Sequence, residues 1–242
     1  MSDWKAKRFW TEVEVTETPG GFGIALDKRP VKTLAKRTLD VPTRAFARAV
    51  AAEWEAQEDV IDPQSMPFTR TANAALDKVA VQHAEVADML AAYGDSDLLC
   101  YRAEQPAVLV RRQCDQWDPM LAWAETALGA RLTVQAGVMH VPQDPQARAA
   151  LNARGHALTA FELAAFHDLV SLSGSLILGF AATQDVKSIE ALWDISRLDE
   201  IWQAEQWGKD DEAEAAAAVK RAAFLHAKSV FDLSRAENSR IA

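Results

Sequence analysis

The spacing of apolar residues changes once along this chain, and this change constrains the fold more than any other feature. Up to residue 42 apolar and polar residues alternate, as in Phe22-x-Ile24-x-Leu26, and this period of two is typical of half-buried β-strands. From residue 43 apolar residues recur three or four positions apart, for example at Phe46 and Val50, as they do along one face of an α-helix. The chain therefore contains a β region followed by a helical region.

We predict an α+β protein that is mainly helical. Residues 1–42 form a small antiparallel β unit, with strands at 9–15, 22–26, 31–34 and 39–41 and turns at Pro19-Gly20-Gly21 and Asp27-Lys28. Residues 43–242 form a mainly helical domain, in which residues 131–141 can form a short β-hairpin. We expect the β unit to pack on this helical body.

Capping residues mark several helix boundaries. Thr43 is a good N-cap, and Gly129 can end a helix. Asp118-Pro119 joins an N-cap residue to a proline suited to the first helical position, so a new helix starts or the axis bends there. We expect helices at 43–61, 69–79, 84–93, 106–117, 119–128, 146–154, 157–172, 173–183, 186–207 and 210–233.

Charge and composition exclude several classes of partner. The net charge of −9 over 242 residues argues against nucleic acid, because phosphate binding needs a basic face. The longest apolar run, residues 169–182, is shorter than the ~20 residues of a membrane-spanning helix, so we expect no membrane insertion. The first ten residues lack the apolar core of a signal peptide and the long basic stretch of a transit peptide. The two cysteines have neither metal-type nor redox-type spacing, which favours a reducing, cytoplasmic location.

Signals of catalysis are weak. The sequence has no Gly-x-x-x-x-Gly-Lys-Ser/Thr loop for nucleotide phosphates and no Gly-x-Ser-x-Gly nucleophile turn. The five histidines are scattered, without cysteines or paired carboxylates at ligand spacing. Cys100 beside Arg102 could be an activated thiolate, but a buried structural thiol is the more common environment. We therefore expect no catalytic residue, no metal and no cofactor.

The most acidic stretch of the chain, residues 199–214, also contains two tryptophans. Seven carboxylates against Lys209 give it a charge of −6. On a helix Glu200, Gln203 and Trp207 lie three and four positions apart, so they share one side, and such a surface suits binding of another macromolecule. A solvated helix with an apolar seam is the structural alternative. Gly208 should end one helix, and Asp210 or Asp211 should begin the next.

Six groups of residues, in this order, resemble the ATP12 family of assembly chaperones for the catalytic sector of ATP synthase. They are Glu53-Trp54-x-x-Gln57-x-x-x-Ile61, Met66-Pro67-x-Thr69, Asn73-x-x-x-Asp77, Asp97-x-x-Cys100-Tyr101-Arg102-x-Glu104-x-Pro106, Trp117-Asp118-Pro119-x-x-x-Trp123-Ala124-Glu125 and Ser196-Arg197-Leu198-Asp199-Glu200-x-x-Gln203-x-x-x-Trp207-Gly208. Each group alone is weakly specific, whereas six in register span nearly the whole chain.

The resemblance implies a non-enzymatic, ATP-independent chaperone, here a bacterial and cytoplasmic member. We separately expect the chain to be a monomer. Such chaperones bind the unassembled α subunit of the catalytic sector until it meets the β subunit. We expect the α-subunit site to contain Glu200, Gln203 and Trp207, with Asp199 and Glu205 nearby. We assign a framework role to Trp54, Tyr101, Arg102, Trp117 and Asp118. Two other functions remain as alternatives: a small-molecule enzyme with a site between the β unit and the helical body, and a general holdase without a fixed client.

Overall fold

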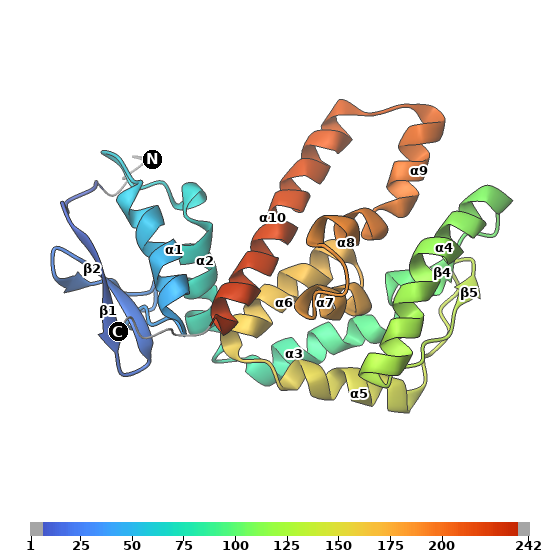
Figure 1. Ribbon diagram of the computed structural model, residues 1–242, viewed down its shortest axis with the longest axis horizontal. Helices are drawn as coiled ribbons and strands as arrows, with labels where there is room; N and C mark the ends of the chain where they lie inside the picture. The colour runs from blue at the N-terminus through green and yellow to red at the C-terminus, as the bar shows by residue number, and fades with distance from the viewer. Residues whose placement is uncertain (1–6, 237–242) are drawn as a thin grey trace. The chain divides into compact units, whose positions relative to one another are not determined.

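The computed structural model describes residues 7–236, and these form two compact units (Figure 1). Within the described residues, the first unit contains residues 7–82, 159–165 and 229–236. The second contains residues 83–158 and 166–228. The units therefore do not divide the chain at residue 42, where the hydrophobic period changes, because the sheet shares its unit with the helices that follow it. The predicted fold class, a small N-terminal antiparallel sheet with a mainly helical remainder, is confirmed.

The sheet of the first unit has three antiparallel strands in the order β1, β2, β3. They comprise Val13–Thr18 (β1), Gly21–Leu26 (β2) and Arg29–Pro30 (β3). The turn between β2 and β3 has positive φ at both central residues, 45° at Asp27 and 65° at Lys28, as two-residue hairpins prefer. Strand β1 begins at Val13, whereas the predicted first strand begins at residue 9.

The predicted strands at 31–34 and 39–41 are wrong. They contribute only isolated bridges, Lys32 to Thr38 and Phe22 to Val41. A tight turn occupies the segment instead, since the Thr33 N–H donates to the Arg37 carbonyl at 2.8 Å. The Asp77 carboxylate holds this turn by accepting from the Thr33 hydroxyl at 2.7 Å and from the Ala35 N–H at 2.9 Å.

Four helical segments follow the sheet within the first unit. They are α1 (Arg44–Glu55), the 3₁₀ turn η1 (Pro63–Ser65), α2 (Pro67–Ala74) and the π-helical η2 (Ala75–Val79). Figure 1 shows α1 lying along the sheet with α2 beside it. Thr43 caps α1 as predicted, accepting from the Phe46 N–H at 3.1 Å. Phe46 and Val50 are fully buried, so the residues that mark the helical period form the core.

The second unit is helical apart from two short strands. In chain order it contains α3 (His83–Ala91), η3 (Ala92–Asp95), η4 (Leu98–Cys100), β4 (Tyr101–Arg102), α4 (Ala107–Trp123), η5 (Ala124–Leu128), β5 (Gln135–Ala136), α5 (Pro145–His156), α7 (Leu176–Thr183), α8 (Ile189–Ser196) and α9 (Leu198–Trp207). Two further helices, α6 (Ala160–Ser173) and α10 (Asp211–Arg235), each contribute residues to both units. Helix α7 is buried from Leu176 to Ala182, and α3 lies beside α5 (Figure 1).

Three local predictions for this unit are corrected. Helix α4 continues through Pro119, although a proline inside a helix removes one backbone N–H donor, so no new helix starts there. The predicted helix at 186–207 is two helices, because the backbone leaves the helical region at Arg197 (φ −106°, ψ 16°). Residues 131–141, all of which are described, form no hairpin, since β5 pairs in parallel with β4. Gly129 does end the preceding helix, with φ 69°.

No helix between residues 7 and 236 combines the length and the apolar character that crossing a bilayer requires.

Candidate functional site

Helix α9 presents three of the predicted binding residues to solvent. Glu200, Gln203 and Trp207 are exposed, and their spacing of three and four places them along one side of the helix. The Trp207 side chain is 79% exposed, which is unusual for an indole. Leu198 is the only residue of α9 that is fully buried. The exposed side of α9 therefore combines a carboxylate, an amide and a large aromatic ring.

The two other predicted binding residues hold α9 on α4. Glu205 accepts two hydrogen bonds from the Arg112 guanidinium, at 2.6 and 3.0 Å. Hydrogen bonding to Arg112 keeps the pKa of Glu205 below its usual value. Asp199 accepts from the Gln113 amide at 2.8 Å, and the buried Gln113 in turn accepts from the Ala103 N–H at 2.8 Å. Both carboxylates thus orient the helix that carries the exposed residues.

Local contacts also fix the two ends of α9. At its start, the Arg197 guanidinium lies 2.7 Å from a Glu200 carboxylate oxygen. At its end, Gly208 has a φ of 91° and its N–H donates to the Ala204 carbonyl, as predicted for a glycine that closes a helix. Asp210 then caps α10 by accepting from the N–H groups of Glu212 and Ala213 at 2.9 and 3.1 Å. Much of the acidity in residues 199–214 therefore serves helix termini.

A groove of about 480 Å³ lies next to this surface, between α4, α8 and α9. Its apolar lining comes from Ala191, Ile195, Leu198 and Ile201, and its polar lining from Arg112, Gln116, Lys187 and Asp194. Within residues 7–236, no three histidine, cysteine or carboxylate side chains are close enough together to hold a metal ion. This mixture of apolar and charged side chains suits contact with a polypeptide.

Comparison with known proteins decides the family. The sequence profile described as "ATP12 chaperone protein" matches residues 7–125. The crystal structure of Atp12 from Paracoccus denitrificans superposes with a TM-score of 0.93 at 48% identity, covering 96% of this chain and 100% of that chain. The chain belongs to the ATP12 chaperone family. The family that was inferred from the six residue groups is therefore confirmed.

Two further relatives of this family agree. A solved structure of a point mutant of P. denitrificans Atp12p has a TM-score of 0.94 and 47% identity, covering 97% of this chain and 100% of that chain. Protein atp12, mitochondrial, from Schizosaccharomyces pombe is 24% identical over 219 residues, which is 86% of this chain and 75% of the yeast protein.

The ATP12-type residue groups of the first unit have structural roles. The buried Glu53 carboxylate accepts from the Phe68 and Thr69 N–H groups at 2.6 and 2.7 Å and so caps α2. Burial raises the pKa of Glu53 despite these bonds. Gln57 accepts from the Asp62 N–H at 2.7 Å and fixes the connection between α1 and α2. Trp54 is half-buried, with its ring 5.2 Å from that of Trp10.

The remaining framework residues meet on α4 and β4 of the second unit. Trp117 is 1% exposed and donates from its indole nitrogen to the Ile195 carbonyl at 3.0 Å. The buried Arg102 guanidinium lies 5.3 Å from the Trp117 ring centre and 2.7 Å from an oxygen of Asp118, whose side chain is exposed. Tyr101 is half-buried on β4. This geometry fits the assigned framework role, which stays a prediction.

Asp97 and Cys100 lie in the interior of the second unit. Asp97 is 0% exposed and accepts from the Leu99 and Ile177 N–H groups, each at 3.0 Å, so it joins η4 to the start of α7. Burial raises the pKa of Asp97 to about 6. Burial and then the Asp97 charge raise the pKa of the Cys100 thiol to about 12. Cys100 is also 1% exposed, so its environment favours a buried structural thiol over an activated thiolate.

The sequence did not indicate Arg112 and Gln113 as partners of the binding residues. Glu205 and Arg112 are 93 positions apart, so their pairing depends on the tertiary fold. The only sequence signal was a basic residue beside an amide on the predicted helix at 106–117.

Proposed function

We propose that this chain is an ATP-independent assembly chaperone that binds the unassembled α subunit of the ATP synthase catalytic sector and shields its interface until it pairs with β. Membership of the ATP12 chaperone family supports the class of function. An unpaired subunit exposes apolar surface that promotes aggregation, so a chaperone for it must cover that surface with an affinity that the true partner can overcome.

The observation that carries the proposal is the exposure of Trp207 at the end of α9. A tryptophan that is 79% exposed contributes little to the stability of its own chain. Tryptophan is, however, among the residues that contribute most to protein interfaces when a partner covers it. Trp207 therefore supplies apolar contact area for the client, at a position fixed by the end of a helix.

The carboxylates supply orientation in this proposal. Glu200 stands on the same side of α9 as Trp207 and is exposed, so it can attract a basic group of the client. Asp199 and Glu205 contribute by holding α9 on α4 through Gln113 and Arg112. A client would then meet a preformed surface and little ordering would accompany binding.

The test is capture of purified α subunit, with β subunit and an unrelated unfolded protein as comparison clients. Glu200→Lys should weaken α capture by about tenfold or more while thermal unfolding stays nearly unchanged, because an exposed charge contributes little to stability. Glu212→Lys is the matched control, since it makes the same charge change on an exposed residue of the same acidic stretch. Normal capture by Glu200→Lys, or equal losses in both variants, would contradict the assignment.

The comparison clients separate this proposal from the alternatives. Equal capture of α, β and the unrelated protein would favour a general holdase. Failure to capture any polypeptide would favour the other alternative, a small-molecule enzyme.

A cytoplasmic site of action is also part of the proposal. Cys100 and Cys114 are both free thiols, and free thiols are typical of reducing compartments. Cell fractionation with an antibody to the chain tests the location, and recovery outside the cytoplasmic fraction would contradict it.

A further inference from the structure

The segment between η5 and α5 exposes an apolar loop on the second unit. We call residues 134–141 the apolar loop. Val138 is 90% exposed and Met139 is 78% exposed, while Val134 and Val141 are each 43% exposed. The sequence from Leu132 to Val141 contains no aspartate, glutamate, lysine or arginine. A contiguous group of exposed apolar side chains in a folded protein marks an interaction surface more often than scattered single ones do.

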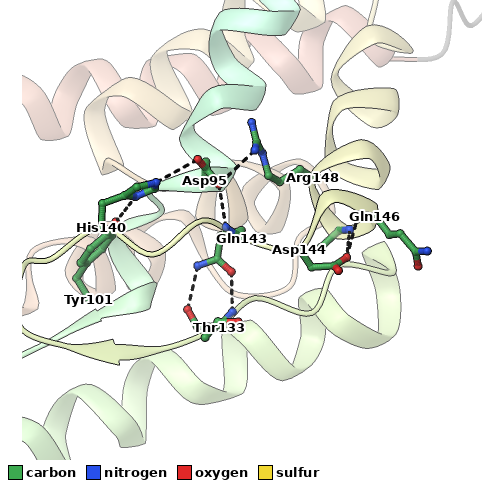
Figure 2. Close-up of polar contacts among 9 residues, drawn as sticks. Asp95, Tyr101, Thr133, His140, Gln143, Asp144, Gln146 and Arg148 are labelled. Carbon is green, nitrogen blue, oxygen red and sulfur yellow. Dashed lines mark hydrogen bonds and ion pairs between the residues drawn. The ribbon is translucent and has the colours of Figure 1, made fainter.

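The base of the apolar loop is closed by one glutamine. The buried Gln143 accepts from the Thr133 N–H at 2.7 Å and donates to the Thr133 carbonyl at 2.9 Å, which joins the two ends of the segment (Figure 2). The Gln143 N–H also donates to the Asp95 carboxylate at 2.9 Å. Gln143 therefore joins the two ends of the loop to each other and is itself anchored to Asp95 of η3.

Polar contacts along the loop hold it further. His140 has one ring nitrogen 3.4 Å from an Asp95 oxygen and the other 3.3 Å from the Tyr101 hydroxyl (Figure 2). Arg148 on α5 approaches the same Asp95 carboxylate at 3.5 Å. The His140 side chain thus ties the loop to Asp95 and Tyr101, while Val138 and Met139 remain exposed.

The backbone of the loop is also fixed. β5 pairs with β4, and the Gly137 N–H donates to the Arg102 carbonyl at 2.9 Å. The Gln135 amide donates to the Met139 carbonyl across the tip. Gly137 has a φ of 80°, which a glycine adopts without strain. Val138 and Met139 are therefore presented by a hydrogen-bonded loop, and such preorganised contacts lose little conformational entropy on binding.

A free carboxylate lies beside the tip. A Cβ atom on Gly137 would be 3.3 Å from a Glu104 oxygen, so the Glu104 side chain reaches the loop. Glu104 is exposed, and no ion pair engages it within residues 7–236. The loop thus offers apolar contact area with an unpaired negative charge at its edge.

We propose that the apolar loop is a second client-binding surface, which takes an apolar segment of polypeptide that carries a lysine or arginine close to Glu104. This inference rests on the proposed function, because the polypeptide is the client of the chaperone. The charge pattern favours a basic polypeptide over a lipid surface, since anionic headgroups would be repelled by Glu104 and by a chain of net charge −9. A client that reaches both the loop and α9 makes two linked contacts, which strengthen capture more than either alone.

The experiment measures capture of α subunit, diluted from denaturant, by the full chain and by the double variant V138D/M139D. Because both side chains are exposed, the variant should unfold at the temperature of the wild type. Capture should fall by about 30-fold, the effect of losing one strongly contributing interface contact. Val81→Asp is the matched control, since Val81 is 59% exposed in a turn of the first unit. Glu104→Gln should slow association several-fold at low salt and have little effect at high salt, whereas Glu58→Gln, at another exposed position, should not.

Each other outcome has a defined meaning. Normal capture by V138D/M139D would overturn the loop inference and leave the proposed function standing.

If the wild type fails to capture α, the proposed function fails. A second assay then tests the loop: suppression of the aggregation of reduced lysozyme, which is an unfolded basic polypeptide. Loss of that suppression in V138D/M139D alone would support the inference, and its retention would overturn it. Co-sedimentation with phosphatidylcholine vesicles, or self-association, that disappears in V138D/M139D would assign the loop to lipid or to a second copy and overturn it as well.

Discussion

Helices α4 and α9 carry the same kinds of residue and use them in opposite ways. On α4, Trp117 is 1% exposed and its indole N–H is bonded to the chain, whereas on α9 Trp207 is 79% exposed. The inward side of α4 also holds Gln113, which is buried and bonded at both ends of its amide. The outward side of α9 holds the exposed Glu200 and Gln203. Residues of both helices belong to the groups that resemble one family, so membership of such a group does not by itself indicate binding.

Four measurements can break or sharpen this contrast between inward and outward residues. The largest effect is expected from Trp117→Ala, which should lower the free energy of unfolding by about 3–5 kcal/mol, because a fully buried ring is replaced by a cavity. Urea unfolding monitored by circular dichroism measures it. Client capture by any variant protein that remains folded should stay normal, and a folded variant with selective loss of capture would move Trp117 to the binding surface.

A second effect depends on pH and concerns the buried Asp97. Because burial raises its folded pKa to about 6, above the usual 3.8, its ionised form destabilises the fold at neutral pH, and this penalty is relieved as pH falls from about 6 toward 4. Relative to Asp97→Asn, the wild type should therefore gain about 2 kcal/mol of unfolding free energy between pH 7.5 and pH 4. Paired urea titrations across this range measure the difference. A difference independent of pH would show that Asp97 titrates normally.

A smaller effect is expected at the joint between the two helices. Gln113→Ala leaves the Ala103 N–H without its acceptor and Asp199 without its donor, so it should cost about 1–3 kcal/mol. It should also weaken client capture, because α9 loses one of its two polar ties to α4. Thermal unfolding and α capture measured on the same protein give both values. Unfolding at the wild-type temperature would indicate that Arg112 and Glu205 alone hold α9.

The smallest effect on stability is expected at Trp207. Trp207→Ala should change the free energy of unfolding by less than about 0.5 kcal/mol, since its ring is mostly in water. Capture of α should nevertheless fall by about tenfold or more. A substantial loss of stability would place the ring in an intramolecular contact and remove it from the proposed site.

Local chemistry predicted much of the fold. The change of hydrophobic period at residue 42, the cap at Thr43 and the closing glycines at 129 and 208 all depend on neighbours within a few positions, and the structure has them where they were expected. Prediction failed where distant residues decide. The alternation within residues 131–141 predicted a short hairpin, but residues 135–136 instead pair with β4, which precedes the whole of α4. Pro119 signals a helix start, yet packing of Trp117 and Met120 keeps α4 continuous across it.

The candidate site shows the same limit. Spacing correctly placed Glu200, Gln203 and Trp207 on one exposed side of a helix. It could not show that Asp199 and Glu205 are engaged by side chains of α4, because the sequence gives no information on which helices are neighbours. The apolar loop was equally hidden, since its exposure follows from how Gln143 and Asp95 hold it.

The division of the chain into interleaved units has a consequence for how the protein is made. The first unit needs stretches from the start, middle and end of the chain: the Phe46 ring lies 5.6 Å from that of Phe161, and the Thr43 hydroxyl donates to the Leu233 carbonyl at 2.5 Å. During translation, the sheet, α1 and α2 emerge long before the last turns of α10. Until the ribosome releases the C-terminal end, the nascent chain exposes a core that it cannot yet close. A chaperone of this design is therefore itself an aggregation-prone polypeptide for most of its own synthesis.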